Sequence, residues 1–282
     1  MSARERAERI HALLRHRDHA EQAIAILESL DDDETKRTFV RGLRVHAPMG
    51  ERWRAEDHVV RAAILCAKAL PEIERELARV SLTHGQLAMP GVGALLAATR
   101  DLAVHGGAAD LLPTAVLRLP VMPHAERVSL FGGTFDLSAL VRSADLTHLS
   151  LLGGELCDTN LPLHPRASLQ QLQLHIAPRL TSLRGLERHG RLRELEITGA
   201  PLGDLEPLAA LHGLVAIDLR DCSFDSLAPL RMLREVRVLA LAGTDTTPDD
   251  LPSNLRPYAT WTPEPPLKRL AQRPVHPDAT VV

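Results

Sequence analysis

One apolar pattern recurs through the second half of the chain and limits what the chain can fold into. It consists of an apolar residue, two variable residues, a second apolar residue, one variable residue and a third apolar residue. The pattern occurs six times with starts 21 to 23 residues apart, at Ala125, Leu146, Leu169, Leu192, Leu214 and Val236. A fixed period of this length predicts a solenoid, in which each repeat adds one strand to a sheet and one layer to a shared core.

The second halves of the repeats match as well. An apolar residue follows each predicted strand where the chain turns into its return segment, at Phe135, Leu156, Leu180, Leu202 and Phe224. The tightest pair of copies reads Leu-x-x-Leu-x-Pro-Leu-x-x-Leu from Leu202 and Phe-x-x-Leu-x-Pro-Leu-x-x-Leu from Phe224. The whole pattern resembles the 22-residue class of leucine-rich repeats known from bacterial internalins and from phosphatase-regulating proteins.

The resemblance implies a short leucine-rich-repeat solenoid with a curved parallel sheet. Together with the all-α N-terminal domain that the spacing of apolar residues predicts before it, this gives an α/β fold class. The family often places Asn, Cys or Thr at the ninth position of the repeat, where the side chain bonds to neighbouring turns. In the early copies this chain has Gly133, Gly154, Ala177 and Ala200 instead. We therefore expect the early coils to be less regular than the later ones.

Four segments are predicted along the chain. Residues 1–105 form a helical domain, since apolar residues recur at three and four spacing and acidic caps punctuate them. Its helices are expected near 3–16, 19–30 and 34–45, around Val59 to Leu70, from Pro71, and over 92–104. Residues 106–124 form a transition segment with a capping strand near Val116, and residues 125–252 form the repeats. Residues 253–282 are a Pro-rich cap and tail, in which Trp261 packs over the last coil and residues beyond about 270 are loose.

Composition excludes several functions. Aromatic residues make up 2% of the chain, the net charge is −3, and no block of Lys and Arg is present, so we expect no nucleic-acid partner. Neither a signal peptide nor an apolar run long enough for a membrane span is present, so we expect no membrane partner. The three widely separated cysteines have no metal or redox spacing, which favours a reducing compartment, the cytoplasm.

Residues that alternate with the apolar triplet point out from the concave face of the predicted sheet. Phe131 and Leu152 form an apolar spot there, which could anchor a partner. Glu194, Glu196 and Asp218 form an acidic cluster that favours a protein partner with a basic surface, although an acidic cluster can also be purely solubilising. The candidate partner-binding set is completed by the polar neighbours of this cluster, Arg220, Gln171, Gln173, His148 and His175.

The residue patterns in this chain that come near those of catalytic sites have the wrong spacing or the wrong structural context. Gly91-Val-Gly93 lacks a third glycine and is expected to be the start of a helix. His11, His16 and His19 do not share one helical face, which argues against a metal site. The sequence therefore predicts a non-catalytic protein-binding scaffold without a cofactor or metal. The alternative is an effector or toxin-like enzyme, with its activity in the helical domain and the repeats as targeting module. The oligomeric state stays open.

Overall fold

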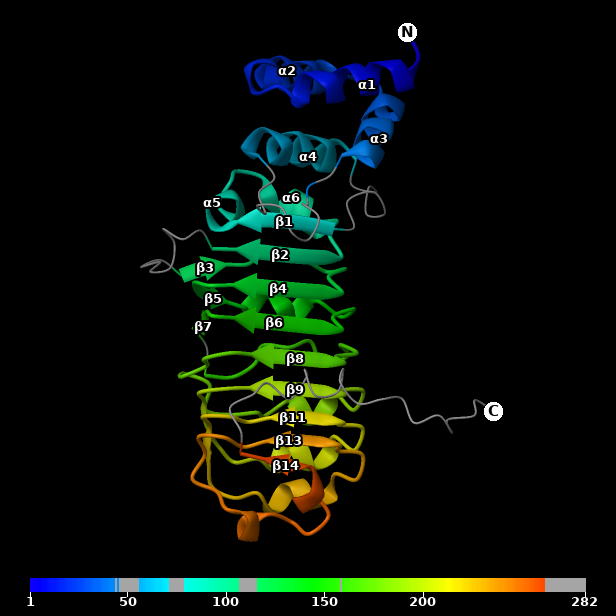
Figure 1. Ribbon diagram of the computed structural model, residues 1–282. Helices are drawn as coiled ribbons and strands as arrows, with labels where there is room; N and C mark the ends of the chain where they lie inside the picture. The colour runs from blue at the N-terminus through cyan, green and yellow to red at the C-terminus, as the bar shows by residue number, and fades with distance from the viewer. Residues whose placement is uncertain (44, 46–55, 71–78, 107–115, 158, 262–282) are drawn as a thin grey trace, which may run out of the picture. The chain divides into compact units, whose positions relative to one another are not determined.

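The computed structural model describes residues 1–43, 45, 56–70, 79–106, 116–157 and 159–261 (Figure 1). These fall into two compact units. The first consists of Met1–Asp158 and Pro162–Leu169, and the second consists of Thr159–Leu161 and Gln170–Val282.

The first unit begins with helices, drawn in blue to cyan in Figure 1: α1 (Ala3–Leu14), α2 (Ala20–Ser29), α3 (Asp33–Gly42) and α4 (Asp57–Ala69), with a short 3₁₀ turn η1 (Arg17–His19). Helix α1 packs against α2 and α3, and α4 packs against α2, α3 and α6 (Val92–Ala97). Their facing sides bury Ile10, Ile24, Leu27, Phe39 and Val60. Helices are therefore confirmed close to four of the predicted segments.

The helix caps agree with the sequence in part. Ser2 and Glu5 form the predicted capping box, in which each side chain accepts the other residue's backbone N–H. At α3, however, the N-cap is Asp32 rather than Asp31, because its carboxylate accepts from the N–H groups of the next turn. The Asp18 box is not formed, since Asp18 lies inside η1.

The first unit continues with a parallel sheet in the order β1 (Arg79–Thr83), β2 (Asp101–His105), β4 (Arg127–Phe131) and β6 (His148–Leu152). Helices α5 (His84–Leu87) and α6 lie between β1 and β2 in the chain. A second parallel sheet is formed by the short strands β3 (Val116–Arg118), β5 (Thr134–Asp136) and β7 (Glu155–Leu156), and η3 (Ser138–Arg142) follows β5.

The expectation of an all-helical domain up to residue 105 is therefore wrong at two places, because Arg79–Thr83 and Asp101–His105 are strands. The predicted sixth helix ends at Ala97, and β2 pairs with β4 in the same register as the later repeats. The fifth helix expected from Pro71 falls largely outside the described residues. The strand near Val116 exists, but it is not a cap. It pairs with β5, and its Leu117 lies opposite Phe135, so it is the second strand of the repeat that β2 begins.

The second unit contains a parallel sheet of β8 (Gln171–Leu174), β9 (Glu194–Ile197), β11 (Ala216–Asp218), β13 (Val238–Ala240) and β14 (Ala259–Thr260). Strands β10 (Pro201–Gly203) and β12 (Ser223–Phe224) pair separately. The return segments and the C-terminal turns are 3₁₀ helices: η4 (Leu186–Arg188), η5 (Glu206–Ala210), η6 (Ala228–Met232), η7 (Pro248–Asp250) and η8 (Arg256–Tyr258). Pro207 and Pro229 lie in the first turns of η5 and η6, where a missing N–H costs nothing.

The proline-rich end adds one more strand than the sequence predicted. Although only a Pro-rich cap and tail were predicted after residue 252, Ala259 of β14 pairs with Leu239 of β13. The indole Nε1 of Trp261 donates to the carbonyl of Thr246 at 3.1 Å. Trp261 therefore packs on the last coil as predicted, while residues 262–282, including the expected loose tail, lie outside the described residues.

The apolar triplets form the core beneath the strands. Each of their residues, from Ala125 to Leu241, is at most 1% exposed. Four of the five corner residues are buried too, and Phe224 is the half-exposed exception. The early coils are not less regular, which corrects that expectation: strands β4 and β6 pair over five residues, but β11 and β13 pair over three. Backbone bonds replace the missing ninth side chains, as when Glu155 N–H donates to Gly133 O at 2.8 Å.

A left-handed turn follows each of the strands β4, β6, β8, β9, β11 and β13. The residue five positions after the start of these strands has a φ between +57° and +74°, at Gly132, Gly153, Ile176, Gly199, Asp221 and Gly243. Glycine adopts this conformation without strain, whereas a β-branched residue does not. Ile176 also gains little from burial, since its side chain is 59% exposed. The turn at Ile176 is therefore the most strained of the six.

We predict that Ile176→Gly stabilises the protein by roughly 0.5–1 kcal/mol. Removing the backbone strain of a left-handed β-branched residue should raise the free energy of unfolding by about 1–2 kcal/mol. The greater conformational freedom of glycine in the unfolded chain offsets part of that gain. Urea unfolding measures the change in the free energy of unfolding. A destabilised variant would show that the turn is not strained.

Gly153→Ala is the matched control. Gly153 has a φ of +66°, and an added Cβ would meet no atom within 4 Å, so only the backbone conformation is tested. This variant should lose about 1 kcal/mol.

Candidate functional site

The residues that alternate with the core residues of each strand form the face of the sheet opposite the core, called the outer face below. The predicted rows of this face are confirmed within each unit by the strand register. In the second unit, Gln173 lies opposite Glu196, which lies opposite Asp218. In the first unit, Phe131 lies opposite Leu152.

A buried polar network occupies the outer face of the second unit. Asp218 is 1% exposed and Glu196 is 5% exposed. The guanidinium of Arg220 binds Asp218 through two nitrogens, with Nε at 2.9 Å from both carboxylate oxygens and Nη2 at 2.7 Å from Oδ2. The same Nη2 lies 3.6 Å from Oε1 of Glu196. One arginine therefore serves both carboxylates.

Strand β8 and the turn after it complete this network around Glu196. Nε2 of His175 lies 2.7 Å from Oε1 of Glu196, and Nε2 of Gln173 donates to Oε2 at 3.0 Å. Burial alone would raise the pKa of Glu196, but the contact with His175, the charges of His175 and Arg220, and the Gln173 bond outweigh it. The pKa of Glu196 consequently lies below its ordinary value.

The network corrects the prediction of an acidic cluster open to a partner. Glu196 and Asp218 are buried and paired, because the long side chain of Arg220 folds back across its own strand to reach Asp218. Of the three acidic residues only Glu194 is partly exposed, and it lies in the neighbouring row opposite Ala216. The network therefore presents little negative charge to a partner, and it depends on each buried charge keeping its counter-charge.

The remaining predicted residues stay partly accessible. Gln171 is half-buried opposite Glu194, and His148 of the first unit is half-buried with its Nδ1 2.8 Å from the hydroxyl of Thr147. The small residues of β13, Val238 and Ala240, are buried.

The outer face of the first unit contains residues that the sequence did not single out, because β1 and β2 were expected to be helical. Asp101 on β2 accepts a bond from Arg79 Nε at 3.0 Å and another from Arg127 Nε at 3.0 Å. At the other end of the same strands, the ring of His105 stacks on Phe131 with centroids 4.7 Å apart. The face thus has a charged edge and an aromatic edge. The sequence signal for this face was the triplet Leu77, Val80 and Leu82, which has the spacing of the repeats, together with the alternation at residues 102–104 that lies 22 residues further on.

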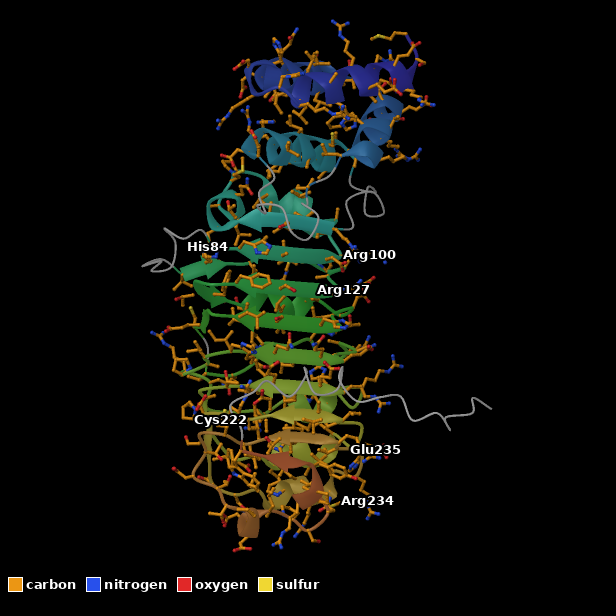
Figure 2. The ribbon with its side chains drawn as sticks, in the orientation of Figure 1. His84, Arg100, Arg127, Cys222, Arg234 and Glu235 are labelled. Carbon is orange, nitrogen blue, oxygen red and sulfur yellow. The ribbon has the colours of Figure 1, made fainter. Side chains whose placement is uncertain are left out.

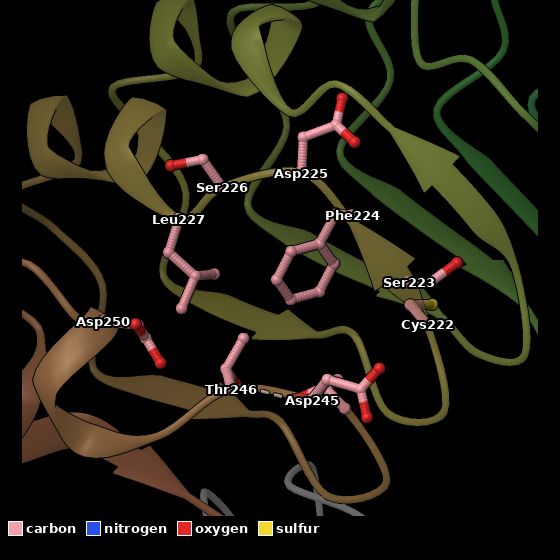
Figure 3. Close-up of a pocket in the computed structure, with 10 residues that line it drawn as sticks. Cys222, Ser223, Phe224, Asp225, Ser226, Leu227, Asp245, Thr246 and Asp250 are labelled. Atoms are coloured by element: carbon pink, nitrogen blue, oxygen red, sulfur yellow. Dashed lines mark hydrogen bonds between the residues drawn. The ribbon is translucent and has the colours of Figure 1, made fainter.

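A pocket in the second unit lies between η6 and the turn after β13 (Figure 3). Its lining includes Asp225, Asp245 and Asp250, together with the ring of Phe224. The carboxylate of Asp250 forms part of the N-terminal cap of η7, since its Oδ2 accepts hydrogen bonds from the N–H and hydroxyl of Thr247. Burial raises the pKa of the Cys222 thiol in this pocket to about 11, which makes it a poor nucleophile.

Among the described residues, no three His, Cys, Asp or Glu side chains come together in an arrangement suited to a metal ion. Likewise, none of the helices within the described ranges combines the length and the apolar character needed to cross a membrane. Gly91, which was expected at the start of a helix, is the left-handed residue that precedes α6, with a φ of +87°.

No protein-family model and no curated protein matches the chain. Among solved structures, the chain is similar to an internalin (inlF) of Listeria monocytogenes, with 17% identity and a TM-score of 0.43 over 62% of this chain and 51% of that one. Internalin C2 of the same species gives 18% identity and a TM-score of 0.45 over 64% and 78%. A leucine-rich-repeat protein of Leptospira interrogans gives 20% identity and a TM-score of 0.39 over 63% and 52%.

The chain thus spans about half the length of the first and third of these proteins. The class of fold is defined by its own geometry. In-register parallel strands, a buried apolar triplet in each repeat and a shared left-handed turn make it a leucine-rich-repeat fold.

We predict that Arg220→Ala destabilises the protein by about 3 kcal/mol, because it leaves the buried carboxylate of Asp218 without its counter-charge. Chemical denaturation measures the loss. Arg234→Ala is the control, since Arg234 is exposed and its substitution should change stability by less than about 0.5 kcal/mol. Equal effects of the two variants would contradict the structural role of the network.

The lowered pKa of Glu196 predicts a pH dependence. The native state takes up this proton less readily than the unfolded state, so the stabilisation is fully present above the ordinary pKa of glutamate. It is lost as the pH falls through the lowered native-state value. The free-energy difference between wild type and Glu196→Gln should therefore shrink on acidification, as followed by urea unfolding at a series of pH values. A difference that is constant with pH would show that Glu196 does not titrate in this way.

Proposed function

We propose that the chain is a protein-binding scaffold that contacts its partner through the outer face of the first unit. The observation that carries the proposal is the contrast between the two outer faces. In the second unit the residues at 196, 218, 238 and 240 are buried. In the first unit Arg79 and Arg127 are exposed, and Ser129, Phe131 and Leu152 are partly exposed.

The size of this face favours binding of a short segment over binding of a folded domain. Four strands about 4.8 Å apart, each presenting about 13 Å of length, give a projected area of roughly 250 Å². A standard interface takes about 800 Å² from each protein. The face alone therefore suits a short segment of a partner, and a larger folded partner would also have to contact a flank of the sheet or the helices.

The scaffold is further proposed to act in a reducing compartment such as the cytoplasm. The proposal is supported by Cys66, Cys157 and Cys222, all of which are free thiols in the structure. The alternative of an enzyme in the helical domain is not favoured by any group of residues in the described helices α1 to α4.

We expect a photoreactive amino acid at Ser129 to cross-link a discrete partner in an extract of the native cell. Ser129 lies in the middle row of the outer face, between the charged and aromatic edges. The same amino acid at Ser138 is the control, because Ser138 is exposed on η3 of the same unit and lies off this sheet. Equal labelling from both positions, or labelling from Ser138 alone, would contradict binding at the outer face.

A further inference from the structure

The charged edge of the first unit holds one more positive than negative charge. Asp101 divides its two carboxylate oxygens between Arg79 and Arg127, and each arginine uses only its Nε for this bond. Within the described residues, the terminal guanidinium nitrogens of both arginines have no hydrogen bond, and their side chains are 65% and 50% exposed. The nearby Arg100 and Glu126 pair with each other at 2.8 Å and add no net charge. Figure 2 shows Arg100 and Arg127 at the same end of the strands.

The opposite edge is apolar and uncharged near neutral pH. Phe131 carries the stacked ring of His105 on one side and lies opposite Leu152 on the other. Burial and the neighbouring His84 lower the pKa of His105, so its ring is neutral under these conditions. At the turns beyond this edge, a Cβ added at Gly132 or Gly153 would meet no atom of the described residues within 4 Å.

Small side chains separate the two edges. The middle row of the face consists of residues no larger than serine: Ser81, Ala103, Ser129 and Ser150. The charged and aromatic rows are four residues apart along each strand, which is about 13 Å. Among the described residues, the row of small side chains thus lies between a cationic row and an aromatic row at a fixed distance, and this strip of the face is called the trough below.

We propose that this trough binds an extended segment of a partner protein that carries an Asp or Glu four residues from an aromatic or large aliphatic residue. The inference rests on the proposed function and specifies the partner. In an extended chain, side chains four residues apart point the same way and are separated by the same 13 Å or so. The carboxylate would take the free donors of Arg79 and Arg127, and the apolar side chain would lie on Phe131 and Leu152.

The net charge of the charged edge favours a carboxylate over a phosphorylated side chain. The charged edge has one net positive charge, which matches a carboxylate, whereas a phosphorylated side chain carries close to two negative charges. The size of the face also matches a single extended segment rather than a folded domain.

The test is selection of random linear peptides displayed on phage against the full-length chain. Enriched peptides should share an Asp or Glu four positions from Phe, Tyr, Trp or Leu. Binding of one such synthetic peptide is then measured by calorimetry. Arg127→Ala should weaken it about tenfold or more, and so should Phe131→Ala. Arg118→Ala is the charge-matched control, since Arg118 is 83% exposed on β3 in the other sheet of the unit and should leave the affinity unchanged.

A charge-swap variant distinguishes the loss of a binding contact from misfolding. Arg127→Glu should lose the acidic peptide and bind the same peptide with Lys in place of its acidic residue. Two results would overturn the proposal. One is a peptide selection that does not enrich an acidic residue four positions from a large apolar one, and the other is an equal loss of peptide affinity in Arg127→Ala and Arg118→Ala. If cross-linking from Ser129 persisted in that case, binding through the outer face would stand and only the chemistry assigned to the partner would be wrong.

Discussion

The left-handed turn at the end of the repeat strands determines where each strand ends and how the next strand pairs. It ends the strand at the same place in successive repeats, so that the next apolar corner residue enters the core and the following strand pairs in register. Four of the six turn positions are glycine, which adopts a positive φ without strain. Once the turns coincide, neighbouring coils satisfy each other's backbone groups, and the side chains at the ninth position become unnecessary for this purpose.

The same backbone supports two outer faces of different chemistry. In the second unit, the single positive charge of Arg220 pairs with two carboxylates that the strand register places side by side, and the result is a buried network. In the first unit, one carboxylate lies between two arginines, and their outer nitrogens face away from it. The difference lies in the ratio of arginine to carboxylate and in how much of each group is exposed. It is this difference that separates a stabilising cluster from a surface with unused hydrogen-bond donors.

Much of the fold could be predicted, because the triplets, corner residues and turn glycines repeat at nearly constant spacing. Strand β2 could not, for two physical reasons. Thr99 occupies the first apolar place of its repeat, where it is buried by bonding to Leu95 O, and Asp101 pairs with Arg127, 26 residues further on rather than about 22. Strand β1 does follow the pattern in the sequence, at Leu77, Val80 and Leu82, but the irregular copy at β2 separates it from the other six. The acidic cluster was found from the alternation of side chains. Its pairing with Arg220 was not, since alternation does not tell which way a long side chain folds.

Side-chain footprinting of the chain, alone and with the partner that is cross-linked at Ser129, tests the location of the binding surface most directly. The account predicts that labelling of Phe131 and Leu152 falls when the partner is bound. Labelling of Gln171 and Glu194 on the second unit should not change. Protection confined to the helices α1 to α4 or to the second unit, with Phe131 and Leu152 labelled as in the free chain, would contradict it.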